Sequence, residues 1–300
     1  MPTPLEQSIL KTLCWFSVTD YPVTGFEIWK WLLEPDRTYD LSEVYRVLEL
    51  SEWINERVII RDGHYTLRQN ASASLFVRQE RHLDAIRKYK KLRRAVRFFS
   101  LFESVRAVAA VNTIAWWNTH TASDIDLFLI TKPGSIWSTR FWIVTPFMLF
   151  GIRPHTESSE VQDPFCFSFF ASRSALAMES LRLKEGDHYL AFWAKSIVPL
   201  FDRDGSIEAF HDANAWAHRK LPNASPRRSS IIAMAPIRHL GFLESFYRMI
   251  QQKKFPHAIR SIANQDSRVV ITDEMLKFHE VDRRAEYQKK FEEMFARVCA

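Results

Sequence analysis

Two aspartates at the start of an apolar run are the residues of this chain best suited to chemistry. Asp124 and Asp126 lie in SDIDLFLIT at 123–131, a run that predicts a buried strand. Side chains alternate along a strand, so both carboxylates face one way, with Cα atoms roughly 7 Å apart. Like charges at that distance repel unless a cation lies between them. The pair therefore predicts a site for Mg²⁺, which prefers oxygen ligands, and with it metal-assisted phosphoryl chemistry.

The D-x-D spacing is common, and only its context separates this pair from others. With 35 acidic residues in 300, the spacing arises by chance, and Asp202 and Asp204 repeat it. That second pair lies in FDRDGS, whose glycine predicts an exposed turn. Asp124 and Asp126 instead follow a predicted buried strand at 105–111 after a short polar connection. This context makes them the candidate metal site.

The segments around the pair predict a chain that mixes helices and strands. Runs of apolar and β-branched residues predict the strands, and apolar residues at helical spacing predict the helices. The predicted strands are 105–111, 126–131 and 165–171, and the predicted helices are 135–150 and most of 174–220. An exposed loop is predicted at 222–230, and helical patterns follow it.

Residues 5–67 predict three helices followed by a β-hairpin, the pattern of a winged helix-turn-helix. The hairpin is indicated by Asp62-Gly63 between two β-prone runs. The candidate recognition helix carries three glutamates against a single arginine, Arg46, which disfavours approach to phosphates. A protein-contact or structural role is therefore favoured for this segment, with DNA binding as the alternative.

The segment from about 70 to 100 predicts a long helix with a basic polar side. Its basic residues are Arg78, Arg81, Arg87, Lys88, Lys90, Lys91, Arg93, Arg94 and Arg97. A solvated connector is one interpretation, and a basic wall beside a phosphate-bearing substrate is the other. The whole chain has a formal net charge of +6 and a pI near 9.2, which permits nucleotides or nucleic acid as partners without requiring them.

Composition and apolar runs exclude several classes of protein. Only three cysteines occur, widely separated, so neither a disulfide framework nor a zinc site is predicted. The longest apolar run, at 141–152, is about 12 residues long, contains a proline and is too short to span a bilayer. No basic stretch precedes an apolar one near residue 1, so no signal peptide is expected. We expect a cytoplasmic protein with no membrane partner.

The order of strand, polar turn, short helix and SDIDLFLIT resembles the nucleotidyltransferase domain of the DNA polymerase beta superfamily. The wider layout, including WSTRFW, FCFSFFA and DANAWAHRKLPN, looks like a largely uncharacterised bacterial group in which a winged helix precedes this domain. The resemblance covers residues 5–222, although only 105–131 carries a motif with known chemistry. It implies a Gly-Ser pair that opens a helix and holds a nucleoside triphosphate, two metal-binding aspartates, and a third carboxylate on a later strand.

The resemblance assigns site residues position by position. Asp124 and Asp126 match the catalytic, metal-binding pair, and Ser123 matches the small residue that often precedes it. The Gly-Ser position falls on Asn112 and Thr113, which makes these two, together with Ser123, candidates for binding the nucleotide phosphates. Asparagine adopts the positive φ of such a turn better than most residues, though less freely than glycine.

The chain also departs from the family pattern. Trp117 is a bulky residue at a position where the family has a small one, beside the expected phosphate path. The strand at 165–171 has no acid at its alternate positions, which are Cys166, Ser168 and Phe170. The nearest acids lie in the preceding loop and are Glu157, Glu160 and Asp163. Lys132, directly after the acidic strand, is a further candidate for neutralising phosphate, with an ordinary surface position as an equal alternative.

Together these patterns predict an α+β fold. Its parts are an N-terminal winged helix-turn-helix at 1–68, a basic connecting helix at 69–99, a nucleotidyltransferase-like mixed sheet flanked by helices at 100–222, and a helical C-terminal region at 223–300. The resemblance implies a Mg²⁺-dependent nucleotidyltransferase that moves a nucleoside monophosphate from a nucleoside triphosphate to an unidentified acceptor. The alternatives are a catalytically inactive nucleotide-binding or scaffold protein and a DNA-binding regulator.

Overall fold

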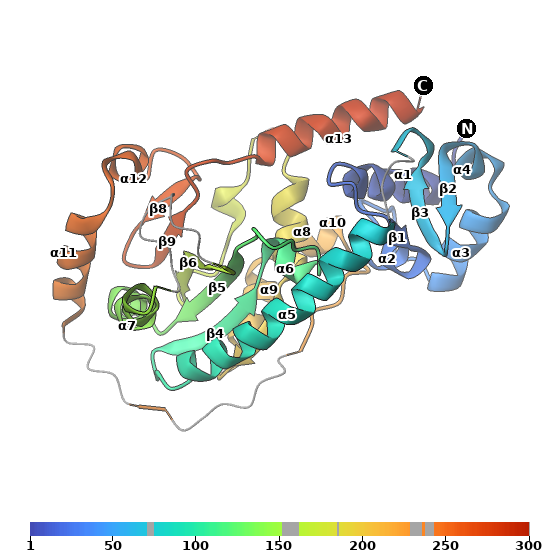
Figure 1. Cartoon of the computed structure of the whole chain (residues 1–300). Coiled ribbons are helices and arrows are strands. Elements are labelled where there is room, and N and C mark those ends of the chain that lie inside the picture. The colour runs from blue at the N-terminus through green and yellow to red at the C-terminus, as the bar shows by residue number, and fades with distance from the viewer. Residues whose placement is uncertain (71–74, 152–161, 185, 229–235, 238–242, 300) are drawn as a thin grey trace.

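The computed structural model describes residues 1–70, 75–151, 162–184, 186–228, 236–237 and 243–299. Within these residues, a mixed six-stranded sheet is flanked by helices on both faces (Figure 1), which confirms the predicted α+β class. The strand order is β7-β4-β5-β6-β9-β8, and only β5 and β6 pair in parallel within this sheet. The strands are β4 (Val105–Ala110), β5 (Ile125–Thr131), β6 (Phe165–Ser172), β7 (Val198–Asp202), β8 (Val269–Ile271) and β9 (Met275–Phe278).

Helices cover both faces of the sheet because side chains alternate along its central strand. Leu127 and Leu129 of β5 join one apolar core, and Phe128 and Ile130 join the other. The first core is covered by α5 (Leu75–Phe99), α7 (Ile136–Leu149), α11 (Glu244–Lys254) and α12 (His257–Ile262), and the second by α8 (His188–Ser196), α9 (Ser206–Ala213) and α10 (Ala215–Lys220). None of the described helices is long and apolar enough to cross a membrane.

Residues 1–67 form an N-terminal module of short helices and a three-stranded sheet with the order β1-β3-β2. The predicted hairpin is confirmed, with Asp62 and Gly63 in the left-handed region at φ 48° and 72°. The third predicted helix is instead two helices, because Ser51 leaves the helical conformation and its hydroxyl accepts the amide of Ile54. The elements are α1 (Pro4–Ser17), β1 (Val23–Thr24), α2 (Gly25–Lys30), α3 (Leu41–Leu50), α4 (Glu52–Arg57), β2 (Val58–Arg61) and β3 (His64–Leu67).

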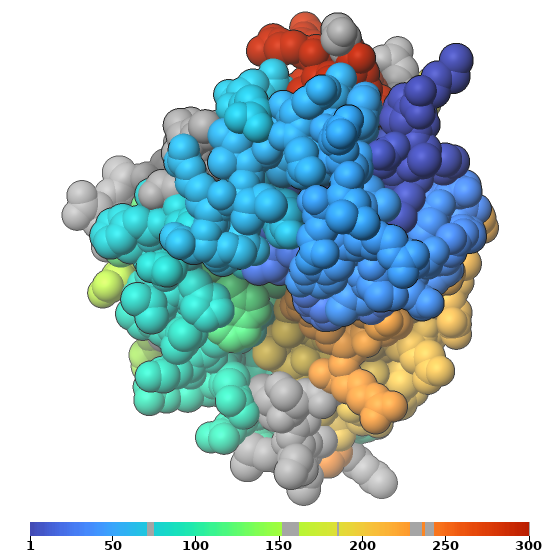
Figure 2. All heavy atoms as spheres, turned by 90° about the vertical axis from the view of Figure 1, so that its right-hand side faces the viewer, coloured from blue at the N-terminus to red at the C-terminus, as the bar shows by residue number. Residues whose placement is uncertain are grey.

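The N-terminal module shares an apolar core with the sheet. Trp15 of α1 stacks on Phe192 of α8, with 4.9 Å between ring centroids. The helix α13 (Arg284–Cys299) returns to the module, where the Arg57 Nε donates to the carbonyl of Val298 at 3.0 Å. Figure 2 shows the module in blue on the upper part of one face, with α13 in red above it. The predicted boundary at 68 therefore marks where the helices and strands of the module end. It does not divide the apolar core, which continues from the module into the sheet domain.

Two segments predicted as helical contain strands. β8 and β9 form a hairpin that extends the sheet beside β6, so the prediction of a wholly helical region at 223–300 is wrong, although its helices α11, α12 and α13 are present. β7 lies within 174–220 and pairs with β4. These runs are three to five residues long. At such lengths, periodicity does not distinguish a strand from a helix.

Candidate functional site

The acid pair lies at the N-terminal edge of β5, beside the start of β6 and the short helix α6 (Asn112–Ala115). Asp126 is half-buried and pairs across the sheet with Cys166, whereas Asp124 lies just before the strand and is exposed. The Asp126 carbonyl accepts the amide of Val111 at 3.2 Å, which fixes this end of β5 next to the turn that opens α6. The pair, the α6 turn and β6 therefore meet at one edge of the sheet.

Neither carboxylate of the pair forms an ion pair with another described residue. Burial raises the pKa of Asp126 to about 6, hydrogen bonds from Asn112 and Cys166 oppose the rise, and the charge of Asp124 adds to it. Burial also raises the pKa of Asp124, and the positive charge of Lys88 opposes that rise. The pair thus lacks a counter-charge in direct contact, which is the electrostatic condition that favours a bound cation.

A buried lysine holds the turn that carries Asp124. The Lys88 side chain is fully buried, and its Nζ donates to the carbonyls of His120 and Ser123 at 2.6 Å each. Lys88 also pairs with the Asp84 carboxylate at 3.2 Å. The Ser123 hydroxyl accepts the His120 amide at 3.0 Å, so it is used inside the turn. Ser123, predicted as a phosphate contact, therefore has a structural role in shaping the turn.

The turn that opens α6 has a left-handed residue, as the sequence predicted. Asn112 has φ 55°, in the region that glycine adopts freely and that asparagine tolerates better than most other residues. The Asn112 Oδ1 accepts the hydroxyl of Tyr189 at 3.2 Å, and its side chain also hydrogen-bonds to the Asp126 carboxylate. Thr113 follows it and is exposed. Asn112 thus links the turn, α8 and the acid pair.

Trp117, predicted to intrude on the phosphate path, packs against α5 instead. Its ring stacks on Tyr89, with 4.4 Å between centroids, and on His82 at 5.1 Å. Trp117 has φ 55°, a left-handed conformation that is unusual for a bulky residue. The Trp117 backbone therefore adopts an unfavourable conformation that places its indole on α5, and the indole does not cover the Asn112 turn.

Lys132 lies at the opposite end of β5 from the acid pair. Six residues separate it from Asp126 along an extended strand, which is a distance of roughly 20 Å. The Lys132 Nζ lies 3.5 Å from the Glu103 carboxylate, and its amide donates to the carbonyl of Ser104. The prediction that Lys132 contributes to the phosphate site is therefore wrong, because the strand carries it away from the site.

The neighbouring strand β6 supplies no third carboxylate. Cys166 faces Asp126, and the Ser168 hydroxyl lies 3.2 Å from the Nε2 of His279. The register shifts between Cys166 and Phe169, so Phe169 and not Phe170 lies on the face of Phe128. Placing Phe170 on the same face as Cys166 was therefore wrong, because strict alternation does not continue through a bulge.

The acids of the loop before β6 do not complete the site within the described residues. The Asp163 carboxylate is buried and binds the guanidinium of Arg87, with 2.6 Å between Oδ1 and Nη2. Glu157 and Glu160 lie outside the described residues. The described part of the chain contains no group of three or more acidic, histidine or cysteine side chains suited to a metal. Any metal ligation by described side chains therefore depends on Asp124 and Asp126.

The second D-x-D pair has the turn role that the sequence predicted. The Asp202 carboxylate accepts the amides of Ser206 and Ile207, at 2.9 Å and 3.1 Å, at the start of α9. The Asp204 carboxylate lies 3.6 Å from the guanidinium of Arg106. Asp202 and Asp204 are therefore both satisfied by the chain itself, whereas the candidate pair forms no ion pair with a described residue.

Two cavities meet at Asn112. The aromatic pocket, of about 130 Å³, lies between the N-terminal module and α8, and Trp15, Trp116, Phe192 and Tyr287 are among its walls. The cationic pocket, of about 190 Å³, lies between α8 and the segment before α13. Asn112, Tyr189 and Tyr287 line both cavities, and the two tyrosine rings stack at 5.7 Å and 9°. A ligand at the Asn112 turn would therefore have an apolar cavity on one side and a polar one on the other.

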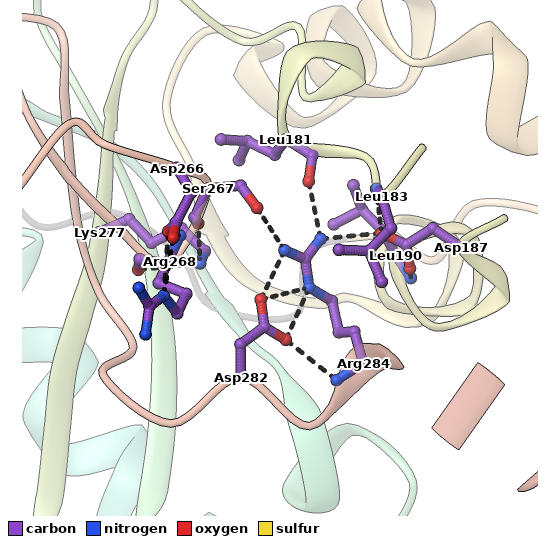
Figure 3. Close-up of polar contacts among 10 residues, drawn as sticks. All are labelled: Leu181, Leu183, Asp187, Leu190, Asp266, Ser267, Arg268, Lys277, Asp282 and Arg284. Carbon is purple, nitrogen blue, oxygen red and sulfur yellow. Dashed lines mark hydrogen bonds and ion pairs between the residues drawn. The ribbon is translucent and has the colours of Figure 1, made fainter. Parts of the chain in front are cut away.

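Arg284 is the centre of a buried cluster in the wall of the cationic pocket (Figure 3), and its side chain is only 6% exposed. Its guanidinium binds Asp187 and Asp282, at 2.8 Å and 2.6 Å. It also donates to the Leu181 carbonyl and the Ser267 hydroxyl. Burial alone would raise the pKa of Asp282, but the hydrogen bonds and charge of Arg284 bring it below its ordinary value. The cluster therefore ties the segment before α13 to α8.

The remaining basic groups of the cationic pocket differ in availability. Burial and the nearby Arg284 lower the pKa of Lys277 to about 8, and its ammonium donates to the carbonyls of Ser267 and Arg268. Burial lowers the pKa of His279 to about 4, so this ring is neutral at neutral pH. Arg283 is exposed, and its guanidinium forms no ion pair or hydrogen bond with another described residue. Arg283 is therefore the guanidinium that remains available to an anion.

Sequence patterns did not identify Tyr189, Tyr287 or Arg284 as neighbours of the acid pair. The run HYLAFWAKS contained a usable signal, since its aromatic residues at 189, 192 and 193 share one face of a helix. That face now lines the aromatic pocket. Nothing in the local sequence around Arg284 indicated that α13 begins beside α8.

Comparisons with known proteins were made for the whole chain. No family model matches it, and neither the curated proteins nor the solved structures gave a match. Its function is therefore inferred from its own residues and their geometry.

Proposed function

We propose that this chain is a metal-dependent nucleotidyltransferase, with a winged helix at its N-terminal module and a nucleotidyltransferase-like sheet domain. One observation carries the proposal. Asp124 and Asp126 form no ion pair with a described residue and lie beside the left-handed turn at Asn112, where two cavities meet. An uncompensated carboxylate pair next to an exposed backbone turn suits a cation and a phosphate together.

Asp124 and Asp126 would hold Mg²⁺, and their chemistry fits that ion because both offer oxygen ligands. When bound, Mg²⁺ would neutralise charge that develops on the α-phosphate of a nucleoside triphosphate as an acceptor oxygen attacks and pyrophosphate leaves. Ionised Asp126 is needed for this role, and its pKa of about 6 means that it is mostly ionised at neutral pH. Binding of the metal should therefore weaken as the pH falls below 6.

The two cavities suggest how a nucleotide lies in the site. The aromatic pocket would take the base, because its walls are mainly ring faces, while Asn118 and Thr113 offer polar contacts. The exposed turn of Asn112 and Thr113 would hold the phosphate nearest the base. Arg283, in the cationic pocket, would contact the distal phosphates. This placement leaves the α-phosphate closest to the acid pair.

The first test measures unfolding temperature with ATP, CTP, GTP or UTP, each with and without Mg²⁺. A ligand that binds only the folded state stabilises it by about 2.7 kcal/mol at a concentration 100 times its Kd. We expect one or more nucleotides to stabilise the protein only when Mg²⁺ is present, and Asp124→Asn to abolish the effect. Asp212→Asn is the matched control, because Asp212 is also exposed and its carboxylate has no hydrogen bond or ion pair among the described residues.

Release of pyrophosphate then separates the enzyme from the second candidate, a catalytically inactive nucleotide-binding or scaffold protein. That candidate is favoured by Cys166, which occupies the position across from Asp126 where a third carboxylate is expected. Mg²⁺-dependent nucleotide binding without pyrophosphate release, over a range of acceptors, would select it. Absence of any Mg²⁺-dependent stabilisation by a nucleotide would contradict both candidates.

A further inference from the structure

The basic residues of α5 fall into two groups with different roles. The first group binds neighbouring segments: Arg78 pairs with Glu27, Arg81 donates to Asn118, Arg87 binds Asp163, and Lys88 and Lys91 donate to backbone carbonyls. The second group, which we name the α5 stripe, consists of Lys90, Arg93, Arg94 and Arg97. All four are exposed, and none of their side chains forms a hydrogen bond or ion pair with another described residue.

The α5 stripe is a continuous face of positive charge. Its members are spaced at i, i+3, i+4 and i+7, which places them on one side of the helix over about 10 Å of its length. No acidic residue occurs from 85 to 102, so the helix offers no intrahelical counter-charge to the stripe. Like charges at this spacing destabilise a helix by about 0.2–0.5 kcal/mol per pair. The mutual repulsion of the four side chains therefore destabilises α5, and no acidic neighbour on the helix offsets it.

The exposed face of α13 carries charges of both signs, unlike the α5 stripe. There, Lys290 pairs with Glu286 at 2.6 Å and Lys289 lies 3.8 Å from Glu293, both at i,i+4 spacing. Alternating positive and negative side chains keep a helix soluble without concentrating charge of one sign on its surface. Because the second half of α5 lacks this pattern, solubility alone does not account for the α5 stripe.

We propose that the α5 stripe binds the phosphate backbone of double-stranded nucleic acid. Guanidinium groups bind phosphates through two parallel hydrogen bonds, and three of the four members are arginines. A lipid surface fits less well, because α5 has no exposed large apolar side chain from 84 to 99 that would enter a membrane. Single strands fit less well, because binding to them depends on exposed aromatic rings, which the stripe lacks.

This inference goes beyond the proposed function and does not depend on it. It also places nucleic-acid binding on α5 and not on α3, the candidate recognition helix of the DNA-binding alternative. In α3, Glu43 pairs with Arg37 at 2.6 Å, and the helix retains Glu49 against Arg46. The stripe contacts phosphates only, so we expect binding without sequence preference.

The test uses the full chain and a short, fluorescently labelled duplex DNA of random sequence, with binding measured by anisotropy. Four phosphate contacts give a slope of about −3.6 for log affinity against log salt, so affinity should fall roughly 100-fold between 50 and 200 mM salt. Arg93→Gln/Arg94→Gln should reduce the slope by about 1.8. The matched control Lys253→Gln/Lys254→Gln removes two exposed charges from α11 and should leave the slope unchanged.

Several outcomes would overturn the inference. They are no duplex binding at 50 mM salt, equal effects of the two double variants, and binding to anionic phosphatidylserine vesicles in preference to the duplex. Asp126→Asn should bind the duplex as the unmodified chain does. Failure of nucleotide binding therefore leaves this inference standing, and failure of duplex binding leaves the proposed function standing.

Discussion

Two groups of carboxylates lie near Tyr189, and they differ in what faces them. In the Arg284 cluster, Asp187 is 0% exposed, and Asp282 has a pKa below its ordinary value, because one guanidinium binds both. In the acid pair, burial raises the pKa of Asp126, and no guanidinium or ammonium contacts its carboxylate among the described residues. Burial raises the pKa of both Asp126 and Asp282, but only Asp282 has a guanidinium in contact that outweighs this effect. The Arg284 cluster therefore contains its own cation, whereas the acid pair has no cation in contact among the described residues.

Breaking the complete cluster should have the largest effect. Arg284→Met leaves Asp187 and Asp282 buried without their cation, and we expect the free energy of unfolding to fall by about 3–5 kcal/mol. Urea denaturation measures the change. Arg283→Met, at the exposed neighbour, is the control and should change stability by less than about 0.5 kcal/mol. Equal effects of the two substitutions would show that the cluster contributes little.

Lys88→Met tests the ammonium whose positive charge acts on both carboxylates of the acid pair. It leaves the buried Ser123 carbonyl without its donor and removes one of the donors to the His120 carbonyl and the Asp84 carboxylate, so we expect a loss of about 2–3 kcal/mol in unfolding free energy. The turn with Asp124 should also lose its position, so Mg²⁺-dependent nucleotide binding should weaken. Lys90→Met, on the exposed side of the same helix, is the matched control. A stable variant that binds nucleotide normally would contradict the role given to Lys88.

Asp126→Asn should stabilise the protein at neutral pH. The folded chain keeps the Asp126 proton up to pH about 6, whereas the unfolded chain loses it near 3.8, so wild-type stability falls as the pH rises between these values. The variant cannot ionise and should lack this fall. Its stability relative to wild type should therefore increase by about 1–3 kcal/mol from pH 3.5 to pH 7. Parallel pH profiles for the two proteins would show that Asp126 already has a counter-charge.

Asn112 allows the smallest and most local comparison. Asn112→Gly and Asn112→Ala both remove the contacts to Tyr189 and Asp126, but only alanine is strained at φ 55°. We expect the alanine variant to be less stable than the glycine variant by about 1 kcal/mol in chemical denaturation. Equal stabilities would mean that the turn relaxes out of the left-handed region.

Local patterns predicted the elements near the acid pair well. The strands β4, β5 and β6, the helix α7 and the left-handed Asn112 all follow from short runs of sequence. Lys132 was wrongly assigned to the site because β5 is extended, so residues at its two ends lie far apart although they are close in sequence. The strands β7, β8 and β9 were missed because runs this short carry no period, and only pairing with a neighbour makes them strands.

The candidate site was only half predictable, for a physical reason. Asp124, Asp126, Asn112 and Thr113 lie within one supersecondary unit, so their proximity follows from chain geometry. The walls of both cavities come from α1, α8 and α13, which are far apart in sequence and meet through apolar packing. A single sequence shows that such faces are apolar, but it does not show which faces meet.

The contact between α1 and α13 has a consequence for how the protein is made. Trp15 lies 6.3 Å from Phe291, measured between ring centroids, so part of the apolar side of α1 is covered by a helix synthesised far later. During translation the N-terminal module leaves the ribosome first and is completed only after α13 has emerged. Until then, its uncovered rings are a natural target for chaperones.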